Sequence, residues 1–411
     1  MQNFLAKHTS WLVFGVSILL VLAMLCSKLL LSMTMFGLVL LGVLNRIYGF
    51  GRTIPSFFTQ KNVVAPVSLV LFVVATGAYS TDLGSWWHEV RQIVPVLGLP
   101  IVLYWLPPMT ERQYKGIYAA LAVLCAIAAV STLYTYYATP YYYEILLKQG
   151  RAIQPHLLGI KPIDHIRFSL LAALGCVAGF YLFLTGFEQK YRFLWLLAAL
   201  ILFGTLHILA VRSGLLALYL CAFAAGLRQI FVQKSYKTAF FGLFLLCATS
   251  YTAVKLSPSL QAKYAYTHWE LSEFWKNNTV GQNSDAGRLA SIYVGLQIGN
   301  ENPLLGVGFG DVGGKLPYYY AKHFPSAQKI LLPHNQWAYQ YAAGGILGVL
   351  ALAAALFVPL FYKKNYTDFL FLMFSIVVFS SYLSESTLST ALGVALFSFF
   401  SATTVNYLRK Y

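Results

Sequence analysis

The chain has 411 residues, of which 58% are hydrophobic, 16% aromatic and only 10% charged. Soluble proteins carry about a quarter of charged residues, so this composition excludes a protein whose main solvent is water. The formal net charge of +16 would suit a nucleic-acid-binding protein, but the Lys and Arg residues are dispersed between apolar segments and form no basic stripe. The charge therefore indicates membrane lipids and phosphorylated lipids as partners, and we expect no nucleic acid.

Cysteine and carboxylate usage bears on metals and redox chemistry. All the cysteines fall in apolar segments and their number is odd, which argues against a disulfide framework or a cysteine metal site: Cys26, Cys125, Cys176, Cys221 and Cys247. No Asp-rich motif suited to a divalent ion occurs in the connections. We therefore expect no metal and no cofactor.

Apolar segments long enough to cross a hydrocarbon core of about 30 Å recur along the whole chain. They predict an all-α polytopic membrane protein with about twelve transmembrane helices. The expected spans are roughly 11–26, 29–48, 63–80, 91–108, 116–139, 166–187, 192–210, 213–231, 238–255, 337–362, 367–382 and 388–408. The first lacks a small-residue cleavage site, so we expect a retained helix and no signal peptide. Residues 1–411 are expected to form one domain.

The distribution of basic residues predicts how the helices are oriented. Alternate short connections carry Arg46, Arg52 and Lys61; Arg112 and Lys115; Lys190 and Arg192; Arg228, Lys234 and Lys237; Lys363 and Lys364; and the tail carries Arg409 and Lys410. By the positive-inside rule these connections and both termini are cytoplasmic. The two long connections, residues 140–165 and 256–336, belong to the opposite set and are expected outside.

The larger connection, between the ninth and tenth predicted helices, is too aromatic for a solvated linker. Leu260, Tyr264, Leu271 and Trp275 recur at helical spacing, and the charged side chains lie elsewhere on the turn: Lys263, Glu270 and Lys276. This pattern predicts a helix, so the loop is partly helical. Two placements stay open: a helix on the membrane surface, or a helix packed on the rest of the loop.

Two arginines flank this connection. Arg212 lies between two apolar segments, so we expect its guanidinium at the outer membrane surface or in a cavity. The alternative is that this side chain only extends to the phosphates of membrane lipids. Arg288 follows a helix start at Ser284 and Asp285, where free backbone N–H groups and the helix dipole attract an anion. The alternative for Arg288 is a plain salt bridge to Asp285 or Glu301.

His334 follows Pro333 at the start of the tenth predicted helix. The helix dipole disfavours the imidazolium there, which keeps the ring neutral and able to accept a proton near pH 7. A general base needs this property. A lone interfacial histidine is more often structural, but the nearby arginines and the lack of a competing group of residues favour catalysis.

Three further polar segments are less specific. Residues 302–310 are glycine-rich, but their spacing fits no phosphate-binding fingerprint, which favours a simple turn. Residues 164–168 and 384–386 lie at the ends of predicted helices. On the residues alone, both are interpreted as interfacial polar clusters.

Several short motifs occur in a defined order. They are Arg-Ser-Gly at 212–214, Gly-Arg-Leu at 287–289, Asn-Pro-Leu-Leu-Gly-Val-Gly at 302–308, His-Asn-Gln at 334–336 and Gly-Gly-Ile-Leu-Gly at 344–348. This order resembles the O-antigen ligase and polymerase superfamily, and an O-antigen ligase most of all. The match is specific over about residues 205–350, and the twelve-helix layout supports it elsewhere.

The resemblance implies a periplasmic active site in a multi-pass protein of the bacterial inner membrane. The donor would be a glycan on undecaprenyl pyrophosphate and the acceptor lipid A–core oligosaccharide, in lipopolysaccharide synthesis by an inverting, metal-independent transfer. It also implies roles for the residues at the matching positions. Arg212 and Arg288 would bind the pyrophosphate, and His334 would activate the acceptor hydroxyl. Arg167 would be a third anion ligand, with supporting residues His165, Asn335 and Glu385.

Other activities stay open on the sequence. A polymerase of the same superfamily shares the motifs, although the compact loops and a length of 411 residues favour the ligase. A protein oligosaccharyltransferase would be expected to carry an added domain. A lipid-linked sugar flippase would bury its charges near mid-membrane between broken helices, whereas these residues cluster at the outer helix ends. A purely structural scaffold gives no reason for such a cluster.

Overall fold

The structure is a computed structural model that describes residues 2–48, 57–141, 153–160, 163–232, 234–256, 258–277, 280 and 285–409. Within these ranges every regular element is helical, which confirms the all-α class. Arg52, Ser284, Lys410 and part of the 140–165 connection lie outside the described residues, as do the side chains of Leu260 and Lys263.

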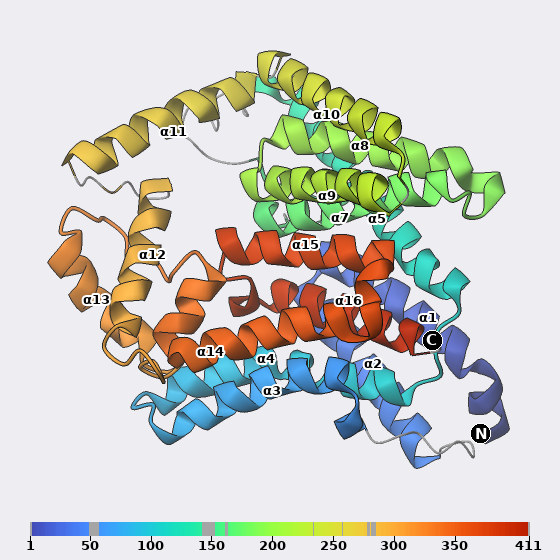
Figure 1. Cartoon of the computed structure of the whole chain (residues 1–411), viewed down its shortest axis with the longest axis horizontal. Helices are drawn as coiled ribbons and strands as arrows, with labels where there is room; N and C mark the ends of the chain where they lie inside the picture. The colour runs from blue at the N-terminus through green and yellow to red at the C-terminus, as the bar shows by residue number, and fades with distance from the viewer. Residues whose placement is uncertain are drawn as a thin grey trace.

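Long helices make up the body of the molecule (Figure 1). They are α1 (Gln2–Cys26), α2 (Lys28–Ile47), α3 (Lys61–Ala75), α4 (Leu83–Trp105), α5 (Glu111–Ala138), α7 (His165–Leu184), α8 (Arg192–Leu209), α9 (Arg212–Phe231), α10 (Tyr236–Leu256), α14 (Gln336–Phe361), α15 (Phe369–Ser384) and α16 (Ala391–Leu408). The connection between α10 and α14 adds α11 (Pro258–Asn277), α12 (Asp285–Gly299) and α13 (Val312–His323). Short 3-10 turns occur at Phe57–Thr59, Thr76–Ala78, Gln189–Tyr191, Tyr362–Thr367 and Thr387–Ser389.

Nine helices in the described part of the chain are long and apolar enough to cross a membrane. The other three predicted spans are also helices, but they do not meet that standard. The first half of α4 carries His88, Glu89 and Arg91, α15 has only 16 residues, and the apolar part of α10 is short. The predicted count of twelve spans is therefore not confirmed, although each predicted segment is a helix.

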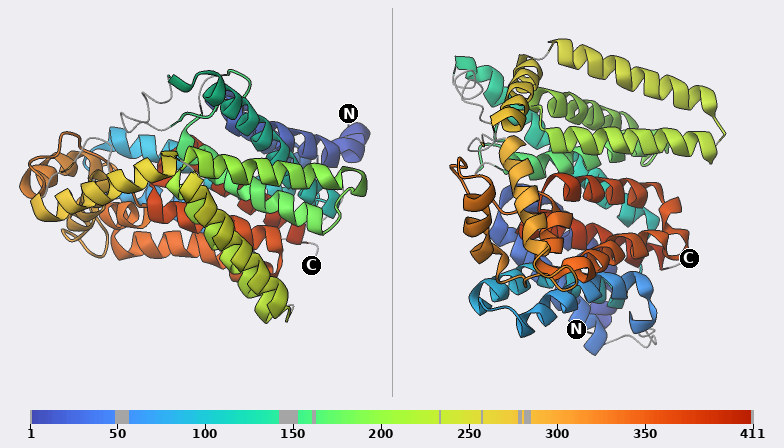
Figure 2. Two further views of the ribbon diagram at one scale, coloured as in Figure 1. Left: turned by 90° about the horizontal axis from the view of Figure 1, so that it is seen from above. Right: turned by 60° about the vertical axis from the view of Figure 1, so that its left-hand side comes forward.

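The bundle has two distinct ends. Helices α11–α13 gather at one end, on the left of Figure 1, and both termini lie at the opposite end. We call these the loop end and the terminal end. α7, α9, α14 and α16 begin at the loop end, and α1 and α15 end there. Figure 2 shows α10 crossing the other helices at an angle.

Helix α7 lies at the centre of the bundle, in contact with α5, α8, α9 and α15. Small residues allow this close packing: a Cβ at Gly179 would lie 2.9 Å from the Trp195 carbonyl oxygen of α8. The start of α7 is thereby fixed in the middle of the loop end, where Arg167 lies in its first turn.

Helix α14 is interrupted at Gly345, which has a φ of 57°. The connection at residues 303–308 supplies hydrogen-bond partners on both sides of the break. Its amides donate to the carbonyls of residues 342–343, and its carbonyls accept from the amides of residues 346–347, at 2.8–3.3 Å. The backbone groups released by the break are thus satisfied. The interpretation of residues 302–310 as a glycine turn is confirmed.

Helix α11 confirms the helix predicted in the large connection, and Glu270 lies on a different side of it from Tyr264 and Trp275, as the pattern predicted. The pattern did not predict the surroundings of Glu270. That residue is buried, because its carboxylate accepts the Asp285 amide and caps α12. Phe274 is buried beside it, whereas Tyr264 and Trp275 are exposed. One face of α11 therefore packs on the protein, and the opposite face presents aromatic side chains, as a helix at a membrane surface does.

Candidate functional site

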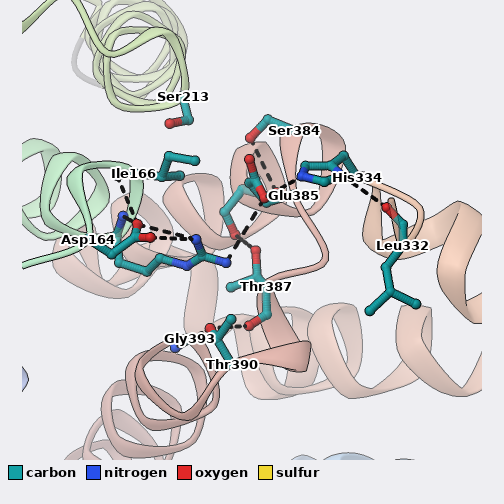
Figure 3. A network of polar contacts seen from close by, with 12 residues as sticks. Asp164, Ile166, Ser213, Leu332, His334, Ser384, Glu385, Thr387, Thr390 and Gly393 are labelled. Carbon is teal, nitrogen blue, oxygen red and sulfur yellow. Dashed lines mark hydrogen bonds and ion pairs between the residues drawn. The ribbon is translucent and has the colours of Figure 1, made fainter. Parts of the chain in front are cut away.

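A buried carboxylate, Glu385, lies at the centre of the loop end. It follows the last residue of α15 in a short turn that Gln336 holds by accepting the Leu388 amide at 2.8 Å. Its side chain is only 5% exposed. Arg288 Nη2 lies 3.0 Å from Oε1 without the alignment of a hydrogen bond, and Arg167 Nη2 lies 4.0 Å from Oε2. His334 Nε2 also lies 4.0 Å from Oε2, and Figure 3 shows His334 beside Glu385.

The first turn of α7 fixes Arg167. Asp164 caps the helix by accepting the amides of Ile166 and Arg167 at 3.0 and 3.1 Å, and both its oxygens lie 3.2 Å from Arg167 Nη1. Burial raises the pKa of Asp164. The Arg167 charge and these hydrogen bonds together lower that pKa by more than burial raises it, so the pKa lies below its ordinary value. A charged Asp164 therefore holds the guanidinium of Arg167 next to Glu385.

Helix α12 supplies Arg288 in its first turn, as expected. The alternative of a salt bridge to Asp285 or Glu301 is wrong, because Arg288 pairs with Glu385. Glu301 pairs instead with Lys315, at 2.7 Å.

His334 is held from α12 as well. Its amide donates to Ser291 Oγ at 3.0 Å, and that hydroxyl donates to the Arg288 carbonyl at 2.7 Å. The ring Nδ1 lies 2.9 Å from the Leu332 carbonyl. Since a carbonyl only accepts, we assign a proton to Nδ1, so Nε2, the atom nearest to Glu385, is the ring nitrogen that can act as acceptor. His334 can therefore accept a proton within the cluster.

The two other supporting residues have different surroundings. Asn335 caps α14 by accepting the Ala338 amide at 3.0 Å, and its Nδ2 donates to the Leu383 carbonyl at 3.0 Å. It thus ties the start of α14 to the end of α15 and sets His334 relative to Glu385. His165 lies beside Gln154, with 3.3 Å between Nδ1 and Nε2.

Arg212 begins α9 and forms an ion pair with Asp285, the first residue of α12. Its Nη1 also donates to Thr267 of α11 at 3.1 Å, and its side chain is 53% exposed. Arg212 and Arg288 therefore both reach the first turn of α12, but they pair with different carboxylates. Arg212 is therefore paired with Asp285 and Thr267, which differs from the alternative of a side chain that only extends to lipid phosphates.

Arg212 and Arg288 meet the start of α12, and Arg167 lies beside Glu385. Each of the three arginines is paired with a carboxylate, and the exposed Arg212 and partly exposed Arg288 can exchange that carboxylate for a phosphate. In the described part of the chain, no group of three or more His, Cys, Asp or Glu side chains is placed to hold a metal ion.

Residues 197–353 match the family model described as O-antigen ligase. The match covers less than half of the 411-residue chain, and over that segment the chain is similar to the O-antigen ligase family. The matched segment runs from α8 into α14, includes Arg212, Arg288 and His334, and confirms the resemblance. Arg167 and Glu385 lie outside it. A comparison with curated proteins found no match.

Sequence reasoning missed several residues that position the candidate site. Ser291 lies one helical turn after Arg288, a spacing that would have placed both on one face of α12. Glu270 and Thr267 gave no such signal, because their partner Asp285 belongs to another helix.

Proposed function

We propose that the chain is an O-antigen ligase, an inverting and metal-independent membrane glycosyltransferase. It would move a glycan from undecaprenyl pyrophosphate to lipid A–core oligosaccharide at the periplasmic face of the bacterial inner membrane. The observation that carries this proposal is the meeting of Arg288, Arg167 and His334 around Glu385, in a chain with a segment similar to the O-antigen ligase family.

Arg212 and Arg288 would bind the pyrophosphate of the donor. A guanidinium contacts a phosphate through two parallel hydrogen bonds, so it replaces its carboxylate partner when a phosphate arrives. As the bond between the anomeric carbon and the pyrophosphate oxygen breaks, its electron pair stays on the pyrophosphate. The arginines stabilise that charge.

His334 would act on the acceptor. The acceptor hydroxyl oxygen attacks the anomeric carbon from the side opposite the leaving group and inverts its configuration, and the hydroxyl proton moves to Nε2. Glu385, 4.0 Å from Nε2, stabilises the imidazolium that results. Arg167 would add a third positive charge near the pyrophosphate.

The test is reconstitution of the full chain in vesicles with a defined undecaprenyl pyrophosphate-linked glycan and lipid A–core. A ligase attaches glycan to lipid A–core. A polymerase would instead lengthen the lipid-linked glycan, and a flippase would move it across the bilayer without forming a new bond. Either of these two outcomes would overturn the ligase proposal.

The His334→Ala variant tests the proposed base. General base catalysis is worth about 100-fold to 10,000-fold, so transfer should fall by that factor. The variant should fold normally and bind the lipid-linked donor, whose contacts are assigned to the arginines. His268→Ala, an exposed histidine of α11, is the control and should keep full transfer. Near wild-type transfer by His334→Ala would show that the base lies elsewhere.

A further inference from the structure

An open cleft of about 760 Å³ lies beside Arg167. The end of α1, the start of α2, part of α4 and the starts of α7 and α16 surround it. Pockets that bind small molecules measure roughly 300–1,000 Å³, so the cleft has the size of a binding site.

The lining of the cleft combines polar and apolar side chains. Its polar lining includes the amides of Gln92 and the exposed Gln154, together with the Ser389 hydroxyl, a buried group with no hydrogen-bond partner in the described residues. Lys28 and Leu29, the first two residues of α2, are exposed, and Leu29 is 71% exposed. Amides and hydroxyls suit a sugar, whereas an exposed leucine suits an acyl chain.

Arg167 separates the cleft from the cluster around Glu385. It lines the cleft together with Asp164, and its Nη2 lies 4.0 Å from Glu385 Oε2. The Nε2 of His334 lies 4.0 Å from that same oxygen. Arg167 therefore lies between a molecule in the cleft and the proposed base, His334.

Of the three arginines proposed to bind the pyrophosphate, Arg212 and Arg288 do not line the cleft, whereas Arg167 lies at its border. They belong to α9 and α12, whereas the cleft belongs to α1, α2, α4, α7 and α16. An inverting displacement brings the two substrates to the anomeric carbon from opposite sides. If the donor is held by α9 and α12, the cleft therefore stays available to the acceptor.

We propose that this cleft binds the acceptor, a phosphorylated glycolipid. Its sugars would contact Gln92, Gln154 and Ser389, one hydroxyl would reach His334 past Arg167, and its acyl chains would remain in the bilayer next to α2. Lys28 and Arg167 supply two positive charges against one from Asp164, which matches a phosphorylated headgroup. This inference rests on the proposed function, since it names the binding place of its second substrate.

Photocrosslinking tests which lipid occupies the cleft. Benzoylphenylalanine replaces Leu29 in the cleft lining or, as control, Leu40, an exposed leucine of the same helix outside the cleft. Reconstituted protein is irradiated with labelled lipid A–core or with the labelled lipid-linked donor. We expect lipid A–core to crosslink at position 29 well above its level at position 40. Crosslinking of the donor at position 29, or equal crosslinking of lipid A–core at both positions, would overturn the inference.

A second test uses Cys26, which lines the cleft. In a Cys247→Ser background, a bulky maleimide on Cys26 should raise the acceptor concentration needed for transfer by about tenfold or more, a loss of about 1.4 kcal/mol in acceptor binding. Donor binding should not change, and protein that also carries Cys26→Ser should be unaffected. Unchanged acceptor dependence in labelled, active protein would refute the acceptor cleft and leave the ligase proposal standing. Absence of transfer in unlabelled wild type, with lipid A–core crosslinked at position 29, would refute only the ligase.

Discussion

At the scale of single residues, Glu385 is the least expected member of the site. A buried carboxylate is costly unless it is paired, and here its oxygens lie 3.0–4.0 Å from two guanidinium groups and one imidazole. These contacts hold Arg288 and Arg167 close together before any substrate arrives. We therefore interpret Glu385 as a positioning residue that keeps the arginines in place for an incoming pyrophosphate.

The geometry of the guanidinium should matter at both pyrophosphate candidates. Arg288→Lys and Arg212→Lys keep the charge but lose the paired hydrogen bonds. A hydrogen bond to a charged group is worth about 1.5–3 kcal/mol. Transfer, measured as kcat/KM for the donor, should therefore fall by about 10-fold to 100-fold in each variant. Arg112→Lys is the control, since Arg112 pairs with Glu188 at the terminal end. Full activity in both variants would show that only the positive charge of the arginines matters, and not their paired hydrogen bonds.

Arg212, Arg288 and His334 could be selected from the sequence because charged groups next to membrane spans need a reason to be there. The central place of Glu385 could not be found in this way. It depends on the end of α15 meeting the starts of α7, α12 and α14, which is a property of the whole bundle. The catalytic and binding roles of all these residues stay predictions.

At the scale of elements, α11 is attached to the site by Glu270. Burial raises the pKa of this carboxyl above its ordinary value, although the Asp285 amide favours the charged form. A raised pKa means that protonation favours the docked helix. The stabilisation is complete below the ordinary pKa of the carboxyl and is lost as the pH rises through the raised value.

Hydrogen exchange of α11 should therefore depend on pH. After correction for intrinsic exchange rates, its amides should be better protected at pH 5 than at pH 8. Glu270→Gln keeps an acceptor for the Asp285 amide and removes the charge, so protection should be equal at both pH values. The same pH dependence in the glutamine variant would assign the effect to another group.

The break in α14 should depend on Gly345. A side chain there is strained at a φ of 57°, and its Cβ would overlap the backbone of Leu304. Gly345→Ala should therefore lower the free energy of unfolding by about 1–3 kcal/mol, measured by thermal unfolding in detergent. Gly204→Ala in α8 is the control, because its Cβ meets open space and alanine favours a helix. Equal stability of both variants would show that α14 can adopt ordinary helical backbone angles at position 345.

The sequence located both glycine motifs, at 302–308 and 344–348, but not their pairing. Each motif is local, whereas their hydrogen bonds join segments that the chain separates by α13 and the start of α14. The helical segments were easier to predict, since hydrophobicity alone marks them. The face of α11 was harder, because Glu270 is buried through a contact with α12.

At the scale of the whole molecule, both termini lie at one end of the bundle and α11–α13 lie at the other (Figure 1). The basic connections that contain Lys190 and Arg192, and Lys363 and Lys364, lie between helices at the terminal end. The positive-inside rule assigns this end to the cytoplasm. The proposed site at the loop end would then face the periplasm, where both lipid substrates of a ligase must meet.

Two exposed tyrosines can test this orientation. Tyr318 lies on α13 at the loop end, and Tyr191 lies between α7 and α8 at the terminal end. Each is replaced by cysteine in a background with Cys26→Ser and Cys247→Ser, because Cys125, Cys176 and Cys221 are buried. A membrane-impermeant maleimide should label position 318 in spheroplasts with an intact inner membrane. It should label position 191 only after that membrane is permeabilised. The reverse pattern would place the arginines and His334 at the cytoplasmic face, which would contradict both the orientation assigned from the Lys and Arg residues and the proposed periplasmic site.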